Sequence, residues 1–261
     1  MSMVIGTNVA SLSAQRHLAT SRADMETSME RLASGKRINS AMDDAAGLSI
    51  TNKLDAKITG LNQAVRNAND GISLIKVAEG ALEEISGILT RMKELAVQGA
   101  NGTYSANDLT AMSAEFVAMY NEMTRITDAT DFNGTQVIGA AATIKFQVGD
   151  GASATNDVMS VVTTNSENTA LSVAINSVSL ATAANTLVDS AILLVDTQRG
   201  VLGATANRLE FAVGNLMNRS ENQAAARSRI EDADFAIESA SLAKNQVLQQ
   251  AGTAMLAQAN A

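Results

Sequence analysis

Apolar side chains recur at alternating steps of four and three residues through the first half of the chain, which is the spacing of a coiled-coil face. One irregularity, two consecutive steps of three, overwinds such a coil locally. The members of this stripe are Leu54, Ile58, Leu61, Val65, Ala68, Ile72, Ile75, Ala78, Leu82, Ile85, Leu89, Met92 and Ala96. At 1.5 Å per residue the stripe extends about 60 Å. Asp43 and Asp44 are suited to an N-terminal cap and Gly99 to a stop, so the pattern predicts one long helix.

Two further stripes predict helices that can pack on the first. One is interrupted by polar residues and consists of Leu187, Ala191, Leu194, Gln198, Leu202, Thr205, Leu209, Ala212 and Leu216. The other predicts a shorter helix over about 107–127 and consists of Leu109, Met112, Phe116, Met119 and Met123. Helices with matching apolar faces bury one another. We therefore expect a mainly α fold of long, antiparallel, coiled-coil-like helices.

The period changes between these helices. Residues 131–134 form a turn signal, and residues 143–148 alternate with the period of two that is typical of a strand. Residues 149–151 read as a hairpin turn, and residues 158–163 as the returning strand. This region, about 132–165, predicts a small β-hairpin.

Both ends of the chain carry looser apolar stripes. They consist of Ile5, Val9, Leu12, Leu18, Met25, Met29 and Leu32 near the start, and of Ile230, Ile237, Leu242, Leu248, Ala251 and Met255 near the finish. Each stripe is narrow, and an isolated helix of that kind is marginally stable in water. We expect the two ends to pair with each other and with neighbouring copies, and to be largely disordered before assembly.

Composition removes several classes of function. The chain has no Pro and no Cys, and His17 is its one histidine, so the strongest helix breaker, thiolate metal sites and multi-histidine sites are absent from the sequence. The net charge is −8, and no basic stripe suits nucleic acid. No secretory signal opens the chain, and no apolar run approaches the roughly 20 residues that span a bilayer. These features predict no nucleic-acid partner and no membrane insertion.

Candidate catalytic groups have simpler interpretations. The Gly149-x-Gly151 pattern precedes a strand rather than a helix, so a hairpin turn fits better than a dinucleotide site. Asp43-Asp44 and the acidic cluster at residues 231–234 lie at expected helix starts, where carboxylates complement the helix dipole. No nucleophile motif accompanies His17. The sequence therefore predicts no enzyme, no cofactor and no metal.

Several blocks are more specific than a generic coiled coil. The N-terminal blocks are Ile5–Asn8 (IGTN), Arg31–Asn39 (RLASGKRIN), Asp43–Gly47 (DDAAG), Arg66–Ser73 (RNANDGIS) and Glu94–Gln98 (ELAVQ). The C-terminal blocks are Ala226–Asp234 (ARSRIEDAD), Leu248–Gly252 (LQQAG) and Leu256–Asn260 (LAQAN). With these motifs in this order, both terminal thirds of the chain closely resemble bacterial flagellin. Family members usually continue with a segment containing Val-Leu-Ser-Leu-Leu. If the protein lacks that segment, we expect polymerisation to be affected.

The resemblance implies an architecture and a set of partners. Residues 1–42 and 225–261 would form paired terminal helices of an inner filament-core domain, and residues 43–224 an outer helical domain with the hairpin. The chain would be a minimal flagellin that polymerises with itself into the extracellular flagellar filament used for swimming motility. It would leave the cell through the flagellar type III export apparatus with an export chaperone, without a cleaved signal peptide. Hook-associated junction and cap proteins would bind it as well.

The resemblance also implies functional residues. Filament-core assembly would use the apolar positions Ile5, Val9, Leu12, Leu32, Ile237, Leu248 and Met255. The residues that match the principal contacts of Toll-like receptor 5, the animal flagellin receptor, are Arg91, Leu95 and Glu115. We treat receptor recognition as a secondary hypothesis, because the same residues flank the predicted helix stripe.

Three other interpretations compete with a flagellin. A hook–filament junction protein has similar terminal helices, although the blocks at 226–234 and 248–260 favour a flagellin. An enzyme within residues 130–180 is disfavoured, because about forty residues with one hairpin do not enclose a pocket. A coiled-coil binder that forms no polymer would have its ends protected from hydrogen exchange in the monomer.

Overall fold

A computed structural model describes residues 8–139, 142–151, 153, 156–163 and 172–260. Its contacts divide the chain into two compact units. The first, here called the terminal unit, comprises Met1–Thr59 and Ser220–Ala261, and the second, the central unit, comprises Gly60–Arg219. The sequence-based division into an inner domain (residues 1–42 and 225–261) and an outer domain (residues 43–224) describes layers of a filament. The contacts within one chain do not test it, so it stays a prediction.

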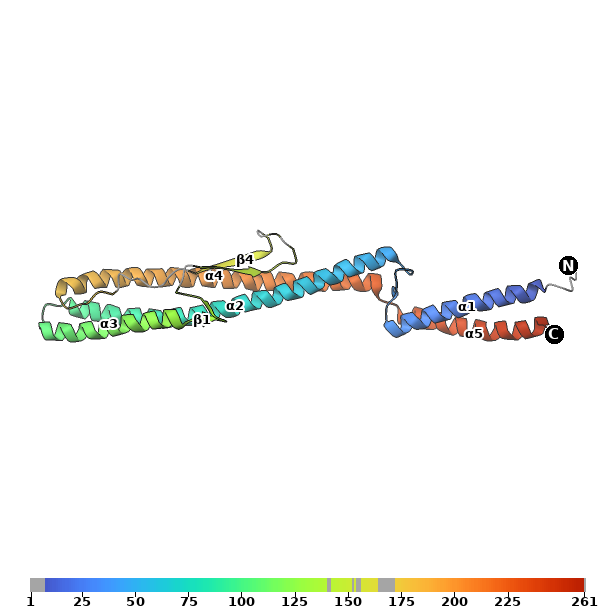
Figure 1. Cartoon of the computed structure of the whole chain (residues 1–261), viewed down its shortest axis with the longest axis horizontal. Helices are drawn as coiled ribbons and strands as arrows, with labels where there is room; N and C mark the ends of the chain where they lie inside the picture. Colours follow the sequence, from blue (N-terminus) through green and yellow to red (C-terminus); the bar gives the residue numbers. More distant parts are fainter. Residues whose placement is uncertain (1–7, 140–141, 152, 154–155, 164–171, 261) are drawn as a thin grey trace. The chain divides into compact units, whose positions relative to one another are not determined.

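Helices α2 (Ala45–Gly99) and α4 (Val178–Glu231) form the antiparallel pair at the heart of the central unit (Figure 1). Glu79 pairs with Arg199 at 2.7 Å and Lys93 with Asp189 at 2.5 Å. The partners on α4 follow in reverse order, so the two helices are antiparallel. From Leu61 onward the predicted stripe of α2 is buried or partly buried. The long helix and its inward face are therefore confirmed.

The inward stripe of α4 differs from the predicted one at Leu194, and the predicted members Leu187 and Ala212 are partly buried. Its buried members are Ala181, Ala184, Val188, Ala191, Val195, Gln198, Leu202, Thr205, Leu209 and Leu216. The prediction of Leu194 in this stripe is wrong, because Val195 takes that place and Leu194 is 41% exposed. Steps of four and three from Ala191 lead to Val195 and then Gln198. The position of a residue around the helix, rather than the size of its side chain, therefore decides that Val195 faces inward and Leu194 does not. Gln198 donates a hydrogen bond to the Val162 carbonyl at 3.1 Å, which explains how a polar residue fits there.

Helix α3 (Ala106–Ala129) packs on α2 in the same unit. Phe116 and Met123 from the predicted stripe are buried, which confirms the inward face of this helix. Ser105 and Asp108 form a reciprocal capping box at its start. The Ser105 hydroxyl and backbone N–H donate hydrogen bonds to the Asp108 carboxylate, and they hold the pKa of Asp108 below its ordinary value.

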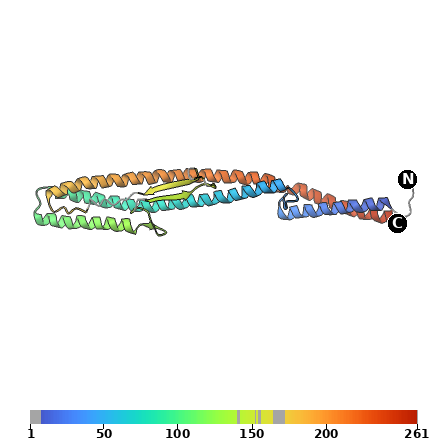
Figure 2. The same cartoon turned by 45° about the horizontal axis from the view of Figure 1, so that its top comes forward.

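Two hairpins join α3 to α4. Strands β1 (Asp131–Phe132) and β2 (Thr135–Gln136) enclose a turn at Asn133-Gly134, where φ is 51° and 77°. Positive φ at both positions is the requirement of a type I′ turn, which Asn-Gly meets at low cost. Strands β3 (Ala142–Gln147) and β4 (Val158–Thr163) pair antiparallel and lie alongside α2 and α4 (Figure 2). The predicted pair of strands is confirmed. The predicted turn at residues 149–151 is not its whole connection, which extends from Val148 to Asp157 and includes residues outside the described ones.

Helices α1 (Val9–Ser34) and α5 (Phe235–Asn260) form an antiparallel pair in the terminal unit. The face that α1 turns toward α5 is largely polar, because its buried residues are Ser11, Ser21 and Ser28. The most buried residues of α5 are Glu238 and Asn245. Small and polar side chains thus line the internal contact, and most of the predicted apolar positions do not.

Helix α4 is long and apolar enough to cross a membrane when only length and composition are considered. The prediction that no such stretch exists is therefore wrong; Ala, Ser and Thr interleaved with its aliphatic residues obscured it. The same helix packs Val188, Val195 and Leu202 into the core of the central unit. Core helices outside membranes meet the same criterion.

Candidate assembly surfaces and the junction of the terminal helices

Two of the motif blocks meet in space, at the junction where α1 turns into α2 and α4 turns into α5. Gly35 ends α1 with φ of 71°, a left-handed conformation that glycine adopts without strain. The next residues then pair with the end of α4, since the Arg37 N–H donates to the Glu231 carbonyl at 2.6 Å. The Ala233 N–H donates to the Gly35 carbonyl at 3.0 Å. The backbone therefore fastens the α1–α2 loop to the α4–α5 turn.

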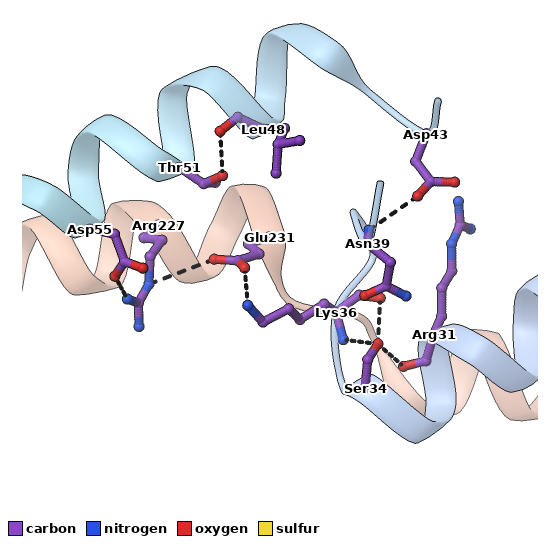
Figure 3. Close-up of polar contacts among 10 residues, drawn as sticks. All are labelled: Arg31, Ser34, Lys36, Asn39, Asp43, Leu48, Thr51, Asp55, Arg227 and Glu231. Carbon is purple, nitrogen blue, oxygen red and sulfur yellow. Dashed lines mark hydrogen bonds and ion pairs between the residues drawn. The ribbon is translucent and has the colours of Figure 1, made fainter. Parts of the chain in front are cut away.

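Ion pairs reinforce this junction (Figure 3). The Glu231 carboxylate, whose side chain is 11% exposed, pairs with the Lys36 ammonium and lies 3.8 Å from Arg227 Nε. Arg227 also pairs with Asp55 on α2. On the other side of the loop, Arg31 of α1 pairs with Glu238 of α5 at 3.2 Å. A nearly buried carboxylate costs desolvation, which paired cations offset.

Acidic residues cap the helices that leave the junction. Asp44 accepts a hydrogen bond from the Gly47 N–H at 2.8 Å at the start of α2, and Asp234 accepts one from the Ala236 N–H at 2.8 Å at the start of α5. The cap interpretation is thus confirmed for these two residues. It is wrong for Glu231, which ends α4 and forms ion pairs instead. Asp43 organises the preceding turn, where hydrogen bonds from Ser40 hold the pKa of Asp43 below its ordinary value.

The predicted assembly residues of α1 and α5 mostly point away from the internal contact. Five of them are between 49% and 71% exposed, namely Val9, Leu12, Ile237, Leu248 and Met255. These five exposed residues are called the outward apolar residues below. Of the other two predicted positions, Leu32 is partly buried, and Ile5 lies outside the described residues. Each helix of the terminal unit therefore keeps apolar surface that its partner helix does not cover.

A groove of about 460 Å³ runs between α1 and α5 and receives part of this surface. Leu18, Leu248, Ala251 and Met255 supply its apolar walls, and His17 lies in it as well. Gly252 lets the helices approach closely, because a Cβ there would lie 2.8 Å from Leu18 Cδ1. The groove therefore presents apolar walls together with one imidazole.

The three predicted receptor residues lie together on α2 and α3 in the central unit. The Arg91 guanidinium donates hydrogen bonds to Glu115 at 2.8 and 3.0 Å and to Glu94 at 2.8 Å. Bonding to Glu115 and then Glu94 raises the pKa of Arg91 above its ordinary value, so its charge is permanent. Leu95, at 1% exposed, is buried beneath this surface. Arg91 and Glu115 thus form the accessible part of the cluster, and Leu95 supports it from below.

The chemistry available to these surfaces is limited. Within the described ranges, no three His, Asp or Glu side chains are arranged to hold a metal ion.

The ion pairs at the junction were not identified from the sequence, although both motif blocks that carry them were. Contacts at this junction join residues far apart in the sequence, and so their spacing carries no signal for pairing. For example, the Arg37 guanidinium donates a 2.7 Å hydrogen bond to the carbonyl of Ile230, 193 residues away.

Comparison with known proteins identifies relatives along almost the whole chain. The family model described as "Bacterial flagellin N-terminal helical region" matches residues 5–143, and "Bacterial flagellin C-terminal helical region" matches residues 185–261. The chain is 42% identical to a flagellin of Halalkalibacterium halodurans, with 99% of this chain and 96% of the relative covered. It is 36% identical to a flagellin of Listeria monocytogenes, with 99% and 96% covered.

Solved structures agree with these relatives. The fold is similar to the crystal structure of Bacillus cereus flagellin, with a TM-score of 0.53 and 31% identity over 62% of this chain and 94% of that one. It is also similar to a putative flagellar hook-associated protein from Vibrio parahaemolyticus, with a TM-score of 0.62 over 73% of this chain and 100% of that one. At 16% identity the second likeness shows the fold alone.

Proposed function

Since this chain belongs to the bacterial flagellin family, we propose that its outward apolar residues are the surfaces through which copies polymerise into the flagellar filament. The observation that carries the proposal is the orientation of α1 and α5. The most buried residues of the two helices are serine, asparagine and glutamate, and the outward apolar residues stay between 49% and 71% exposed, whereas Leu18, Leu32 and Leu242 are partly buried. An exposed apolar surface of this kind marks a protein–protein contact.

The free energy of such a contact is large enough to drive assembly. A fully buried aliphatic side chain contributes about 1.5–3 kcal/mol, so covering a residue that starts half to two-thirds exposed contributes roughly 1–2 kcal/mol. Ordering the backbone opposes this by about 1–2 kcal/mol per residue that was previously free. Several outward residues must therefore be covered together, which two partner helices from neighbouring copies would achieve.

Seeded polymerisation tests the proposal. Purified monomer is mixed with short filament seeds, and growth is followed by light scattering and electron microscopy. Wild-type chain should form long filaments, and Leu248→Ser with Met255→Ser should raise the critical concentration at least about tenfold. Gln246→Ser, an exposed polar change on the same helix, is the matched control. If wild-type chain leaves the filaments only as long as the seeds, the proposal is contradicted. Short caps of wild-type chain on the seed ends would favour a hook–filament junction protein instead.

The terminal helices order on assembly in this scheme. Ser21 of α1 donates a 3.2 Å hydrogen bond to the Asn245 carbonyl of α5 and Arg31 pairs with Glu238, but no described apolar side chain of either helix is fully buried in the pair. Amides of α1 and α5 should therefore exchange with solvent faster than those of α2 in the monomer, and slow down in the filament. Equal protection of α1, α5 and α2 in the monomer would contradict this part of the proposal.

Export and capping follow from the same scheme. Weakly paired terminal helices suit passage of an unfolded chain through the type III export apparatus, with an export chaperone covering the apolar residues before secretion. Delivery without a cleaved signal peptide is expected, and mass spectrometry of secreted chain checks it. Hook-associated junction and cap proteins would bind the same terminal helices at the two ends of the filament.

A second role is recognition by Toll-like receptor 5, for which the exposed Arg91–Glu115 pair gives the support. Monomer is applied to receptor-expressing reporter cells, and Arg91→Ala should lower activation relative to wild type. Arg125→Ala is the matched control, because Arg125 forms a similar exposed pair with Glu122 at 2.6 Å on α3. No response to wild-type chain would exclude this role.

A further inference from the structure

Phe211 is the most exposed large apolar side chain among the described residues of the central unit, at 81%. It lies on α4 two residues beyond the buried Leu209, and residues two apart point to nearly opposite sides of a helix. Aromatic side chains dominate the energetics of cores and interfaces, and this chain has few of them. An aromatic ring held on the outer side of a rigid helix is therefore a candidate anchor for another protein.

The surroundings of Phe211 form an open groove between α4 and the β3–β4 hairpin. The groove has a volume of about 450 Å³ and is lined on the hairpin side by Val148, Val158 and Met159. Arg208 and Arg219 of α4 line it as well. Arg219 is paired with Asp150 at 3.0 Å, whereas exposed Arg208 has no ion pair within the part of the chain that the structure describes. The groove thus combines apolar walls with an uncompensated cation.

The central unit carries its charge unevenly. Described residues 76–139 and 172–203, which the Glu79–Arg199 and Lys93–Asp189 ion pairs join across α2 and α4, contain eleven acidic and five basic residues. The other described residues of the unit, which include the Phe211 groove, contain four of each. The excess of six negative charges therefore lies entirely in the first set, called the acidic part below. A second copy offers this acidic part to Arg208 of its neighbour.

We infer that Phe211 and Arg208 bind the acidic part of the central unit of a neighbouring copy in the filament. This rests on the proposed function and adds a contact outside the terminal helices. Two different patches of one chain meet in such a contact, so it is heterologous, and it propagates along a helical assembly when the rotation between copies does not close a ring. Phe211 supplies the buried anchor, and Arg208 selects the acidic partner surface.

Polymerisation of substituted monomers tests the energetic part of the inference. Phe211→Ala should leave monomer thermal unfolding unchanged, because the ring is exposed there, and should raise the critical concentration at least about tenfold. Arg208→Glu should raise it too, and added salt should lower the critical concentration of this variant, because salt screens the new repulsion from the acidic part. The control is Met217→Ala, an apolar residue that is 58% exposed on the same helix and lies outside both the groove and the acidic part. An equal rise for Met217→Ala and Phe211→Ala would overturn the inference.

A unique thiol tests the location. The chain has no cysteine, so Phe211→Cys gives one reactive site. Copolymerising a small fraction of this variant with wild-type chain keeps filaments forming even if the variant alone assembles poorly. The thiol should react at least about tenfold more slowly in filaments than in monomer. A photo-crosslinker on it should capture peptides from residues 76–139 or 172–203 of another copy. Unchanged reactivity, or crosslinks only to other peptides, would overturn the inference, whereas failure of wild-type chain to polymerise would overturn the proposed function itself.

Discussion

Gly71 lies where three elements of the central unit converge, and replacing it provides a stringent test of that packing. An added Cβ would lie 3.2 Å from Leu209 Cδ1 on α4 and 3.2 Å from Phe146 Cγ on β3. Both neighbours would have to move, and overpacking of this kind typically costs about 1–3 kcal/mol. Opposing it, alanine in place of glycine favours a helix interior by about 0.5–1 kcal/mol. The net expectation for Gly71→Ala is a loss of up to about 2 kcal/mol in the free energy of unfolding.

Gly80→Ala is the matched control on the same helix. A Cβ at Gly80 meets nothing within 4 Å, so only the helix-propensity gain of about 0.5–1 kcal/mol applies. The two identical substitutions should thus differ by about 1–3 kcal/mol. Because the chain has two compact units, a global melt averages over both. Native-state hydrogen exchange of α2 and β3 amides measures the central unit directly. Equal stabilisation by both substitutions would refute the close approach of α4 and the hairpin to Gly71.

Three further substitutions probe single features of the central unit. Leu89→Ala removes a fully buried side chain and should lower the free energy of unfolding by about 2–5 kcal/mol in chemical denaturation. Gln198→Ala should leave the Val162 carbonyl without its hydrogen bond, cost about 1–3 kcal/mol and speed exchange of β4 amides; unchanged exchange would contradict it. Asp108→Asn removes a carboxylate whose folded pKa is lowered by Ser105. Its stabilising effect should be complete above the ordinary aspartate pKa of about 3.9 and disappear as pH falls through the lowered value, so denaturation midpoints of wild type and variant should converge in acid.

The sequence by itself determined which segments are helical and which form the β3–β4 hairpin. A period of 3.6 or of 2 depends on neighbouring residues alone, so the stripe from Leu61 to Ala96 and the alternation at residues 143–148 were sufficient. Local capping chemistry was equally readable, as Asp44 shows. The motif blocks at 31–39 and 226–234 marked the junction as special through their resemblance to a family, without indicating what they do there.

Only the tertiary structure decided which of several adjacent apolar residues face inward. Leu194 and Val195 are both apolar, and the phase of α4 against α2 placed the smaller one in the core. In the same way α1 turned serines toward Glu238 and Asn245 of α5, and the pair left Val9, Ile237 and Met255 exposed. The pairing of Lys36 with Glu231 is likewise a product of the fold, because it joins residues far apart in the chain. Local periodicity carries no information about the phase of one helix relative to another, which depends on contacts between distant segments, and here that phase decides which surfaces remain available for assembly.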